Sequence, residues 1–250
     1  MIVSISGKLN SGKDTVGKIS QILTNFPEMS DSKVVKNLDK EFSNNIFEIK
    51  RFADKLKDIV CLLLNCTREQ LEDREFKEKE LGEEWAIVQG DDYKVLSKEG
   101  FPKDMWTYLT PRKLLQLLGT ECGREIIHPN IWVNALMSGY VPREGNKLGS
   151  LFYPNWIITD MRFPNELKAV EDRGGITIRV NRDIVREEQF EKPGGKKVFV
   201  DRKTITDIVG EHPSETALDN AKFNYTIDNN GTLLDLVQVV RKILKERSII

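Results

Sequence analysis

The chain has 250 residues, of which 39% are hydrophobic and 31% are charged, and its formal net charge is −1. This length fits one substantial α/β domain with insertions, and the interleaved, nearly balanced charges argue against an extended cationic surface for nucleic acid or anionic lipid. The three cysteines, Cys61, Cys66 and Cys122, have no C-x-x-C spacing, which argues against a disulfide framework and a zinc site.

The apolar runs of the sequence are short. The N-terminal run is interrupted at Gly7, so we expect no signal peptide, and the strongest later run, residues 59–64, is too short to cross a bilayer. We therefore expect a cytoplasmic protein with reduced thiols and no membrane contact.

The N-terminal segment predicts a strand, a phosphate-binding loop and a helix in direct succession. Residues 2–5 form a short apolar, β-branched run, Gly7 and Gly12 with Lys13 match the G-x-x-x-x-G-K part of the Walker A pattern, and 14–23 has helical spacing. Glycines let successive backbone N–H groups turn toward a phosphate, and the start of the helix points its positive dipole end at the same place. Lys13 then supplies a full charge for the β- and γ-phosphate oxygens.

The residue after the lysine departs from the Walker A pattern. Asp14 stands where Ser or Thr is usual, and the hydroxyl follows one place later at Thr15. Because a carboxylate beside phosphates is repulsive unless a cation lies between them, we expect Mg²⁺ to be held by Thr15, by Asp14 through water, or by both. The alternative is a chance glycine turn that caps an ordinary βα unit.

Residues 25–64 continue the alternation of strand and helix. A polar, turn-rich connection over 25–45, with one short helical turn, precedes a strand over 46–52 and a helix over 53–64. Lys57 lies near the start of that helix, just beyond a strand end, where α/β sheets bind ligands. The alternative is an exposed lysine that is only solvated.

The stretch from about 67 to 110 is highly charged and has few apolar residues. We expect a helical insertion that packs over the site or closes as a lid, and a solvated surface excursion is the alternative. Thr110 and Pro111 then start a helix, since a hydroxyl N-cap followed by proline is a helix start signal. Gly119 interrupts this helix or closes its packing, and a further short helix is expected over 130–137.

A third strand is predicted over 156–159 and ends on Asp160. A carboxylate at the carboxyl end of a buried parallel strand, in a chain with a Walker A loop, has the outline of a Walker B arrangement. A structural cap is the alternative role for Asp160. Arg162 follows two residues later, and Pro164 opens the next helix.

The last third of the chain predicts two more strands and a final helix. The strands are expected over 176–180 and 224–227, and an amphipathic helix is expected over 233–244. Residues 181–203, between the two strands, form a polar, cationic segment that closes on the site as a flap or stays a solvated loop. His212 has no second metal ligand beside it, so we expect hydrogen bonding there.

Together these pieces resemble the phage-type deoxynucleoside monophosphate kinases, which are relatives of the adenylate and guanylate kinase group within the P-loop fold. The resemblance spans most of the chain, apart from the charged insertion and the cationic segment. Asp14 and Thr15 are what this family shows in place of the usual Walker A ending. The motifs that carry the resemblance are, in order, GKLNSGKDT (7–15), FADKLKD (52–58), RKLLQLLGTE (112–121), IWV (131–133), ITDMRFPNE (158–166), HPSE (212–215) and IDNNGTLLDL (227–236).

The resemblance implies a fold and residue roles. The fold is a three-layer α/β/α architecture of the P-loop NTPase type, with a mainly parallel central sheet, a helical insertion and a flexible lid, in one domain over 1–250. The residues implied for ATP are Gly7, Ser11, Gly12, Lys13, Asp14, Thr15, Asn229 and Gly231, with Asp14 and Thr15 at the metal. Those implied for the acceptor nucleotide are Lys57, Arg112, Gln116, Thr120, Trp132, Asp160, Arg162 and Glu166. Catalysis is assigned to Lys13, Asp160 and Arg162, and Asp160 has two competing assignments, one near the metal and one to the acceptor.

We therefore expect a Mg²⁺-dependent kinase that moves the γ-phosphoryl group of ATP to a (deoxy)nucleoside monophosphate. Its partners would be small-molecule nucleotides, without nucleic acid or membrane; a homodimer is compatible with the sequence, and a phage-encoded chain would act in the host cytoplasm. The acceptor oxygen is already anionic at neutral pH, so no catalytic His or Cys constellation is needed. Two alternatives stay open: a P-loop kinase of another small phosphorylated metabolite, and a nucleotide-binding protein without turnover.

Overall fold

The structure is a computed structural model that describes residues 1–89, 95–144, 150–182, 187–191, 197–201 and 213–250. The chain divides into two compact units. Met1–Phe52 together with Met137–Ile250 form the first unit, and Ala53–Leu136 form the second. Each unit has its own cluster of buried apolar side chains.

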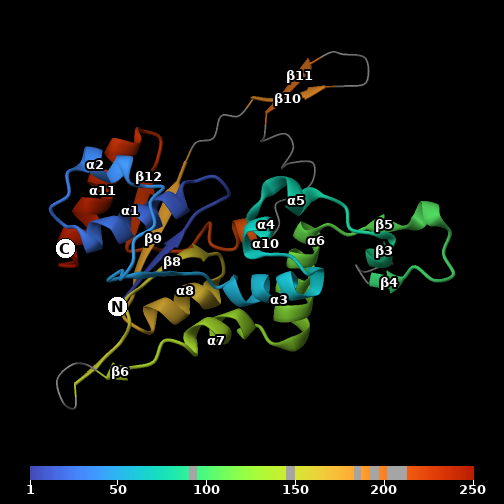
Figure 1. Cartoon of the computed structure of the whole chain (residues 1–250), viewed down its shortest axis with the longest axis horizontal. Helices are drawn as coiled ribbons and strands as arrows, with labels where there is room; N and C mark the ends of the chain where they lie inside the picture. The colour runs from blue at the N-terminus through green and yellow to red at the C-terminus, as the bar shows by residue number, and fades with distance from the viewer. Residues whose placement is uncertain (90–94, 145–149, 183–186, 192–196, 202–212) are drawn as a thin grey trace. The chain divides into compact units, whose positions relative to one another are not determined.

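A five-stranded sheet forms the centre of the first unit (Figure 1). Its neighbouring strands are paired in parallel, with Val3 of the central strand opposite Ile157 on one side and Ile176 on the other. This confirms the expected mainly parallel sheet. In spatial order the strands are β12 (Tyr225–Asp228), β9 (Ile176–Asn181), β1 (Ile2–Ser6), β8 (Trp156–Met161) and β2 (Glu48–Lys50).

The order of the strands places a ligand-binding edge next to β1. From β1 the chain passes first to β2 and β8 on one side, and only afterwards to β9 and β12 on the other. Ligands of open α/β sheets bind at such a reversal of direction, beyond the carboxyl ends of the strands. The loop after β1 lies at this place.

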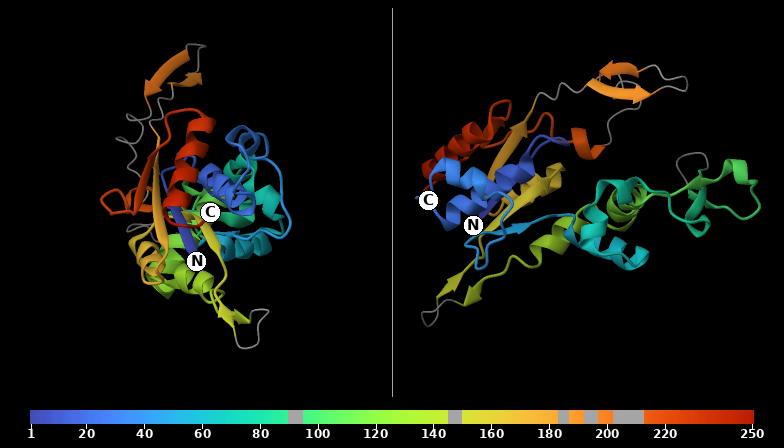
Figure 2. Two further views of the ribbon diagram at one scale, coloured as in Figure 1. Left: turned by 90° about the vertical axis from the view of Figure 1, so that its left-hand side faces the viewer. Right: turned by 45° about the horizontal axis from the view of Figure 1, so that its top comes forward.

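Helices cover both faces of the sheet, so the first unit has the expected three layers (Figures 1 and 2). Val3 and Ile5 of β1 face a buried cluster that includes residues of α1, α2 and α11. The opposite face of β1 carries Ile2. This residue lies beside Gly175, which follows α8 and packs against Val170 of that helix. The helices are α1 (Lys13–Asn25), α2 (Asp31–Lys36), α8 (Pro164–Glu171), α10 (Pro213–Thr216) and α11 (Leu233–Glu246).

Close packing fixes the start of α1 against β8. A Cβ atom at Gly17 would come within 2.4 Å of Cγ2 of Thr159, so only glycine lets the helix approach the strand this closely. Asp14 lies one turn before Gly17, and Asp160 follows Thr159 directly. The first turn of α1 and the carboxyl end of β8 are thereby held in a fixed relation.

The second unit is mostly helical at its two ends. The buried residues of its core include Leu56 and Val60 from α3, Leu71 from α4, and Leu114 from α6. The elements of this part are α3 (Asp54–Leu64), α4 (Arg68–Glu72), α5 (Arg74–Glu78), α6 (Pro111–Gln116), the π-helix η4 (Leu117–Ile127) and α7 (Ile131–Met137).

The helix start at Thr110 and Pro111 is confirmed. The Thr110 hydroxyl accepts a hydrogen bond from Lys113 N at 3.2 Å, and Pro111 is the first residue of α6. Gly119 closes the packing of the helix, because a Cβ there would lie 2.9 Å from Cδ2 of Leu56. The helix continues through this glycine as η4, and π-helical turns occur frequently at functional sites.

The charged stretch of 67–110 contains strands that we did not expect. After α4 and α5 it forms an antiparallel sheet in the order β4-β3-β5, and its described residues also include two short 3₁₀ helices. Ala86 and Val88 are buried on one face of β3, which is the period of 2 that a half-buried strand requires. The further elements are η1 (Glu83–Trp85), β3 (Ala86–Gln89), β4 (Val95–Ser97), η3 (Lys103–Met105) and β5 (Thr107–Tyr108).

The remaining strands of the described residues form two hairpins. β6 (Arg143–Glu144) pairs with β7 (Leu151–Phe152), and β10 (Glu187–Glu191) pairs with β11 (Lys197–Asp201), both antiparallel. The second hairpin belongs to the expected flap of 181–203, whose remaining part lies largely outside the described residues, as does His212. Closure of this segment stays a prediction. Among the described helices, none has the length and apolar character to span a bilayer.

The core of the first unit yields a stability prediction. Ile157→Ala should lower the free energy of unfolding by about 2–5 kcal/mol, because Ile157 is fully buried at the middle of the sheet and its truncation leaves a cavity. Urea denaturation measures the change. Ile46→Ala, at a side chain that is 56% exposed, is the matched control and should change the value by less than about 0.5 kcal/mol. Equal losses in the two variants would contradict this placement of the core.

Candidate functional site

The loop after β1 needs glycine at two places. Gly12 has a left-handed backbone, with φ of 94°, and a Cβ there would lie 2.3 Å from Nδ2 of Asn229. A Cβ at Gly7 would lie 2.3 Å from Oγ of Ser11 and 2.7 Å from the carbonyl oxygen of Val180. Both contacts are too short for any real side chain, so the loop keeps its compact shape only with these glycines.

The turn after β12 holds the loop from the side. Nδ2 of the buried Asn229 donates to the carbonyl oxygen of Ser11 at 2.9 Å, and Asn229 N donates to Asn181 O at 2.7 Å. Gly231 lies farther along the turn, beside Asp235 at the start of α11. Oγ of Ser11 is buried and, within the described part of the chain, has no hydrogen-bond partner. A polar atom left in this state fits a loop that is completed by a ligand.

Lys13 begins α1 and is only 7% exposed. Burial lowers the pKa of its ammonium group, and the charge of Arg162 lowers it further, whereas the charges of Asp14, Glu215 and Asp160 oppose this shift. Two cations and three carboxylates therefore act on one another at the carboxyl edge of the sheet. Because burial is the largest cause of the lowered pKa, an anion that replaces lost solvation would stabilise the charged form of Lys13.

The two expected metal ligands stand at the first turn of the same helix. The Asp14 side chain is 65% exposed and its Oδ1 lies 3.8 Å from Nη2 of Arg51, which follows β2. Thr15 is partly buried. Carboxylate and hydroxyl oxygens are suitable ligands for Mg²⁺, and their position beside Lys13 is where a metal–phosphate complex would need them.

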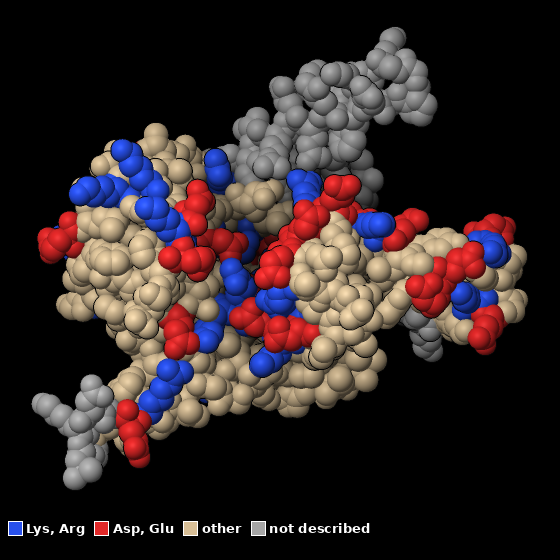
Figure 3. Space-filling model, in the orientation of Figure 1, with Lys and Arg blue, Asp and Glu red and all other residues tan. Residues whose placement is uncertain are grey.

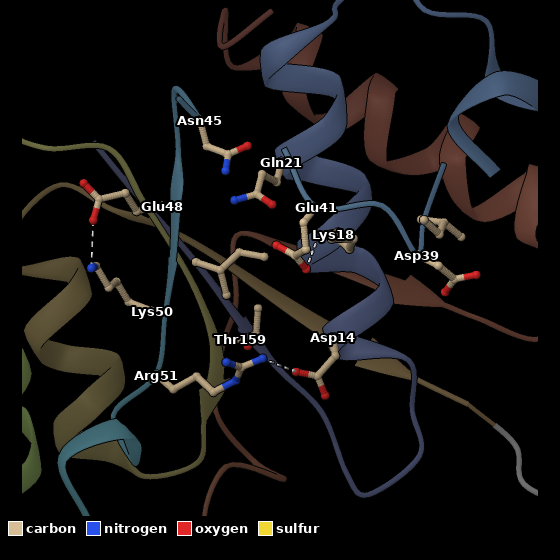
Figure 4. Close-up of a pocket in the computed structure, with 12 residues that line it drawn as sticks. Asp14, Lys18, Gln21, Asp39, Glu41, Asn45, Glu48, Lys50, Arg51 and Thr159 are labelled. Carbon is tan, nitrogen blue, oxygen red and sulfur yellow. Dashed lines mark hydrogen bonds and ion pairs between the residues drawn. The ribbon is translucent and has the colours of Figure 1, made fainter. Parts of the chain in front are cut away.

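A pocket of about 610 Å³ adjoins Asp14 in the first unit (Figure 4). The charged side chains that line it are largely paired with one another, Lys18 with Glu41 and Lys50 with Glu48. Thr159 lies at its base, and Oγ1 of this residue is a further buried oxygen without a partner among the described residues. The pocket extends the site along α1.

Asp160 lies inside β8, which continues one residue farther than expected, to Met161. Its Oδ1 accepts a hydrogen bond from the backbone N–H of Phe52 at 2.8 Å. Phe52 lies just after β2. Asp160 therefore fastens the segment after β2 to the end of β8. Its assignments to the metal or to the acceptor stay predictions.

Arg162 and Glu166 lie at the turn between β8 and α8. The Glu166 carboxylate is buried and accepts hydrogen bonds from the backbone N–H groups of Arg162, at 2.6 Å, and Phe163, at 3.1 Å. The Arg162 guanidinium pairs with Glu215, which also accepts from Leu9 N in the loop. Glu166 thus shapes the backbone that carries Arg162, and Glu215 meets the guanidinium itself.

The remaining predicted acceptor residues belong to the second unit. Nε1 of the buried Trp132 donates to Gly119 O at 2.8 Å, which ties α7 to η4. Lys57 of α3 pairs with Glu72, and Arg112 of α6 pairs with Glu78. The last two, Gln116 and Thr120, lie on α6 and η4.

The carboxyl group of Glu72 in the second unit has a strongly lowered pKa. Burial opposes its ionisation, but hydrogen bonds and charges from Lys57 and Lys77 outweigh burial and lower its pKa from 4.5 to about 2. A carboxylate held in its charged form in this way keeps Lys57 in place.

The predicted residues therefore fall into two sets. The first unit brings together the predicted ATP and metal residues with Asp160, Arg162 and Glu166, and the second carries Lys57, Arg112, Gln116, Thr120 and Trp132. Sequence reasoning assigned no role to Glu215, Arg51, Glu72 or Glu78. For Glu215 the HPSE motif was a signal, whereas the other three stand in mixed charged runs with no local pattern.

Charges of both signs are interspersed on the face of the molecule drawn in Figure 3. Many charged side chains of the protein are paired, such as Lys77 with Glu72 and Lys103 with Glu83. This distribution agrees with the net charge of −1 and gives no support to a nucleic-acid surface on that face.

The chain matches no protein-family model. It is 25% identical over 198 residues to deoxynucleoside-5'-monophosphate kinase of Escherichia phage T5, an alignment that covers 66% of this chain and 70% of that relative. It is 26% identical over 144 residues to a protein provisionally named deoxynucleotide monophosphate kinase from Acanthamoeba polyphaga mimivirus, which covers 53% of this chain and 60% of that relative. This chain is similar to viral deoxynucleotide monophosphate kinases. The resemblance expected from separated motifs is thereby confirmed.

The similarity to viral deoxynucleotide monophosphate kinases agrees with the parallel sheet and the glycine-containing loop after its central strand. Two viral relatives of moderate identity point in the same direction.

The Glu72 ion pairs predict acid sensitivity of the second unit. A carboxyl with a lowered folded-state pKa contributes stability that is present above its unfolded pKa of 4.5 and is lost as the pH falls toward 2. We expect Glu72→Gln to make the loss of unfolding free energy over this window shallower. Urea denaturation followed by tryptophan fluorescence measures it, because three of the four tryptophans lie within Ala53–Leu136.

Glu75→Gln is the matched control, since it removes an exposed carboxyl from α5. It should keep the wild-type acid dependence. The predicted role of Glu72 would be contradicted if both Glu72→Gln and Glu75→Gln lost unfolding free energy with falling pH as steeply as the wild-type protein.

Proposed function

We propose that this protein is a Mg²⁺-dependent kinase that transfers the γ-phosphoryl group of ATP to a deoxynucleoside monophosphate, giving ADP and the deoxynucleoside diphosphate. The observation that carries the proposal is the buried Lys13 at the start of α1, directly after the left-handed Gly12. Similarity to two viral proteins named as kinases of this type supports the choice of acceptor.

ATP would bind with its phosphates on the loop between Gly7 and Lys13. Backbone N–H groups at the start of α1 and the Lys13 ammonium are the donors for the β- and γ-phosphate oxygens. Binding of an anion would compensate the burial and the Arg162 charge that lower the pKa of Lys13. Asn229 would act indirectly, through its hydrogen bond to Ser11, by keeping the loop in shape.

Asp14 and Thr15 are the proposed ligands of the metal, with Asp14 in direct contact or through water. No cluster of three or more His, Cys, Asp or Glu side chains suited to a metal occurs in the part of the chain that the structure describes. Proteins commonly hold Mg²⁺ through one or two carboxylates together with substrate phosphates and water, and Asp14 is such a carboxylate. When bound, the ion neutralises charge on the transferring phosphoryl group.

Arg162, together with Lys57 and Arg112 of the second unit, is proposed to bind the phosphate of the acceptor. Each of these cations is already paired with a glutamate, so each is held in a defined place before substrate arrives. Trp132, Gln116 and Thr120 are proposed to face the acceptor base and sugar. The segments 67–110 and 181–203 are proposed to cover the site, since exclusion of water prevents hydrolysis of ATP.

Catalysis would depend on position and charge. The acceptor monophosphate oxygen is anionic at neutral pH, so the nucleophile needs no strong general base. The obstacle is repulsion between two phosphates, which Lys13, Arg162 and the metal would offset as charge spreads over the γ-phosphoryl oxygens.

A steady-state screen tests the proposed function. The wild-type protein is mixed with ATP, Mg²⁺ and each of the common deoxy- and ribonucleoside monophosphates, and the products are separated. We expect ADP and a nucleoside diphosphate in equal amounts for at least one deoxynucleotide. Inert nucleotides together with phosphorylation of another small phosphorylated compound would contradict the proposed acceptor, and ATP binding without transfer to any acceptor would contradict the enzyme itself.

Lys13→Ala should lower kcat by on the order of a hundredfold or more, because it removes a charge needed in the transition state. Turnover with the best acceptor of the screen is the measurement. The matched control is Lys168→Ala, which removes an exposed lysine of α8 paired with Asp172 and should retain wild-type turnover within about threefold. Near-normal turnover in folded Lys13→Ala protein would be incompatible with the proposed role.

A further inference from the structure

Glu215 joins two parts of the proposed site that are far apart in the sequence. Its Oε2 accepts a hydrogen bond from the backbone N–H of Leu9, in the phosphate loop, at 2.8 Å. Its Oε1 pairs with Nη1 of Arg162, just after β8. The Glu215 and Arg162 side chains are 23% and 29% exposed, so solvent screens this ion pair less than a fully exposed one.

A second carboxylate of the same segment makes a related but different contact. Asp219 pairs with Nζ of Lys8 at 3.1 Å and with Nη2 of Arg179 at 2.8 Å. The segment around α10 is therefore attached to two successive residues of the loop, Lys8 and Leu9. Glu215, in contrast, pairs with Arg162.

Glu215 also balances charge. Its carboxylate pairs with the Arg162 guanidinium and compensates the charge of that side chain. Without the carboxylate, the flexible arginine side chain would lose the ion pair that fixes its position before any phosphate arrives. A guanidinium has five N–H donors, so it can bind a carboxylate and still donate to a phosphate.

We propose that Glu215 is a positioning residue for phosphoryl transfer, which holds the Arg162 guanidinium beside the phosphate loop so that the two phosphates meet a preformed arrangement of cations. This inference rests on the proposed function. It assigns a role to the last residue of the HPSE motif, which neither strand pattern nor Walker motif explains. Preformed charge costs no rearrangement at the moment of transfer.

The test begins with Glu215→Gln, in which the amide oxygen still accepts from Leu9 N but the charge is lost. We expect kcat to fall by about tenfold and KM for the acceptor to rise by about tenfold, with KM for ATP changed by less than about threefold. Glu215→Asp, which keeps the charge, should recover part of the lost kcat/KM. If Glu215 had a purely structural role, the increase would not be confined to KM for the acceptor, and Glu215→Asp would not recover kcat/KM.

Asp219→Asn is the matched control, because it alters a neighbouring carboxylate that contacts the loop at Lys8. Its KM for the acceptor should stay within about threefold of the wild-type value. A double-mutant cycle completes the test: in an Arg162→Ala background, Glu215→Gln should have little further effect on use of the acceptor.

Several results would overturn the inference. A lower KM or higher kcat in Glu215→Gln would mean that the carboxylate competes with phosphate for Arg162. Unchanged kinetics, or an equal loss in the presence and absence of Arg162, would mean that Glu215 does not act through it. A wild-type protein without transferase activity would overturn the proposed function and this role together, whereas an active wild type with unchanged Glu215→Gln overturns this role alone.

Discussion

Electrostatic repulsion between two phosphates is the constraint on which the proposed site depends. A kinase that joins them must concentrate positive charge at one point, yet cations placed together in a folded protein repel one another as well. In this structure burial lowers the pKa of Lys13, the charge of Arg162 lowers it further, and carboxylates from Asp14, Asp160 and Glu215 oppose this shift. The site is therefore a balanced cluster of charges, and incoming phosphates would enter a set of cations that is already arranged.

The fold supplies this arrangement through packing at the sheet edge. Gly17 lets α1 approach Thr159 of β8, and that contact fixes the first turn of the helix. Asn229 holds the loop through the Ser11 carbonyl group. Thr159 belongs to β8 and Asn229 follows β12, and these two strands lie on opposite sides of β1. The parallel sheet therefore determines where the cations lie. Mutations in the sheet core should consequently weaken the site as well as the fold.

Local patterns were sufficient to predict the N-terminal strand, loop and helix of the first unit and the start of one helix of the second unit. The β-branched run, the two glycines and the helical spacing predicted β1, the loop and α1, and Thr110 with Pro111 predicted the start of α6. Each of these signals arises from backbone geometry or periodicity within a few residues. The separated motifs also pointed to the viral kinases that the comparisons then found.

Long-range contacts could not be predicted in the same way. The strands β3, β4 and β5 are short and lie in a charged run, and the alternation of a half-buried strand is limited to the buried Ala86 and Val88 on either side of Ile87 in the part of β3 whose burial is described. The bond between Asp160 and Phe52 N joins residues that are 108 positions apart, and Glu215 reaches Leu9 across 206 positions. No local signal specifies such partners, since they depend on which strands become neighbours.

The most direct test of the account is a crystal structure with Mg²⁺ and a bisubstrate analogue, in which adenosine and a deoxynucleoside are joined by a chain of phosphates. The account predicts phosphates on the loop between Gly7 and Lys13, in contact with the Lys13 ammonium, and the Arg162 guanidinium on the side of the deoxynucleoside. An analogue bound elsewhere, with the loop filled by side chains of the protein itself, would contradict it.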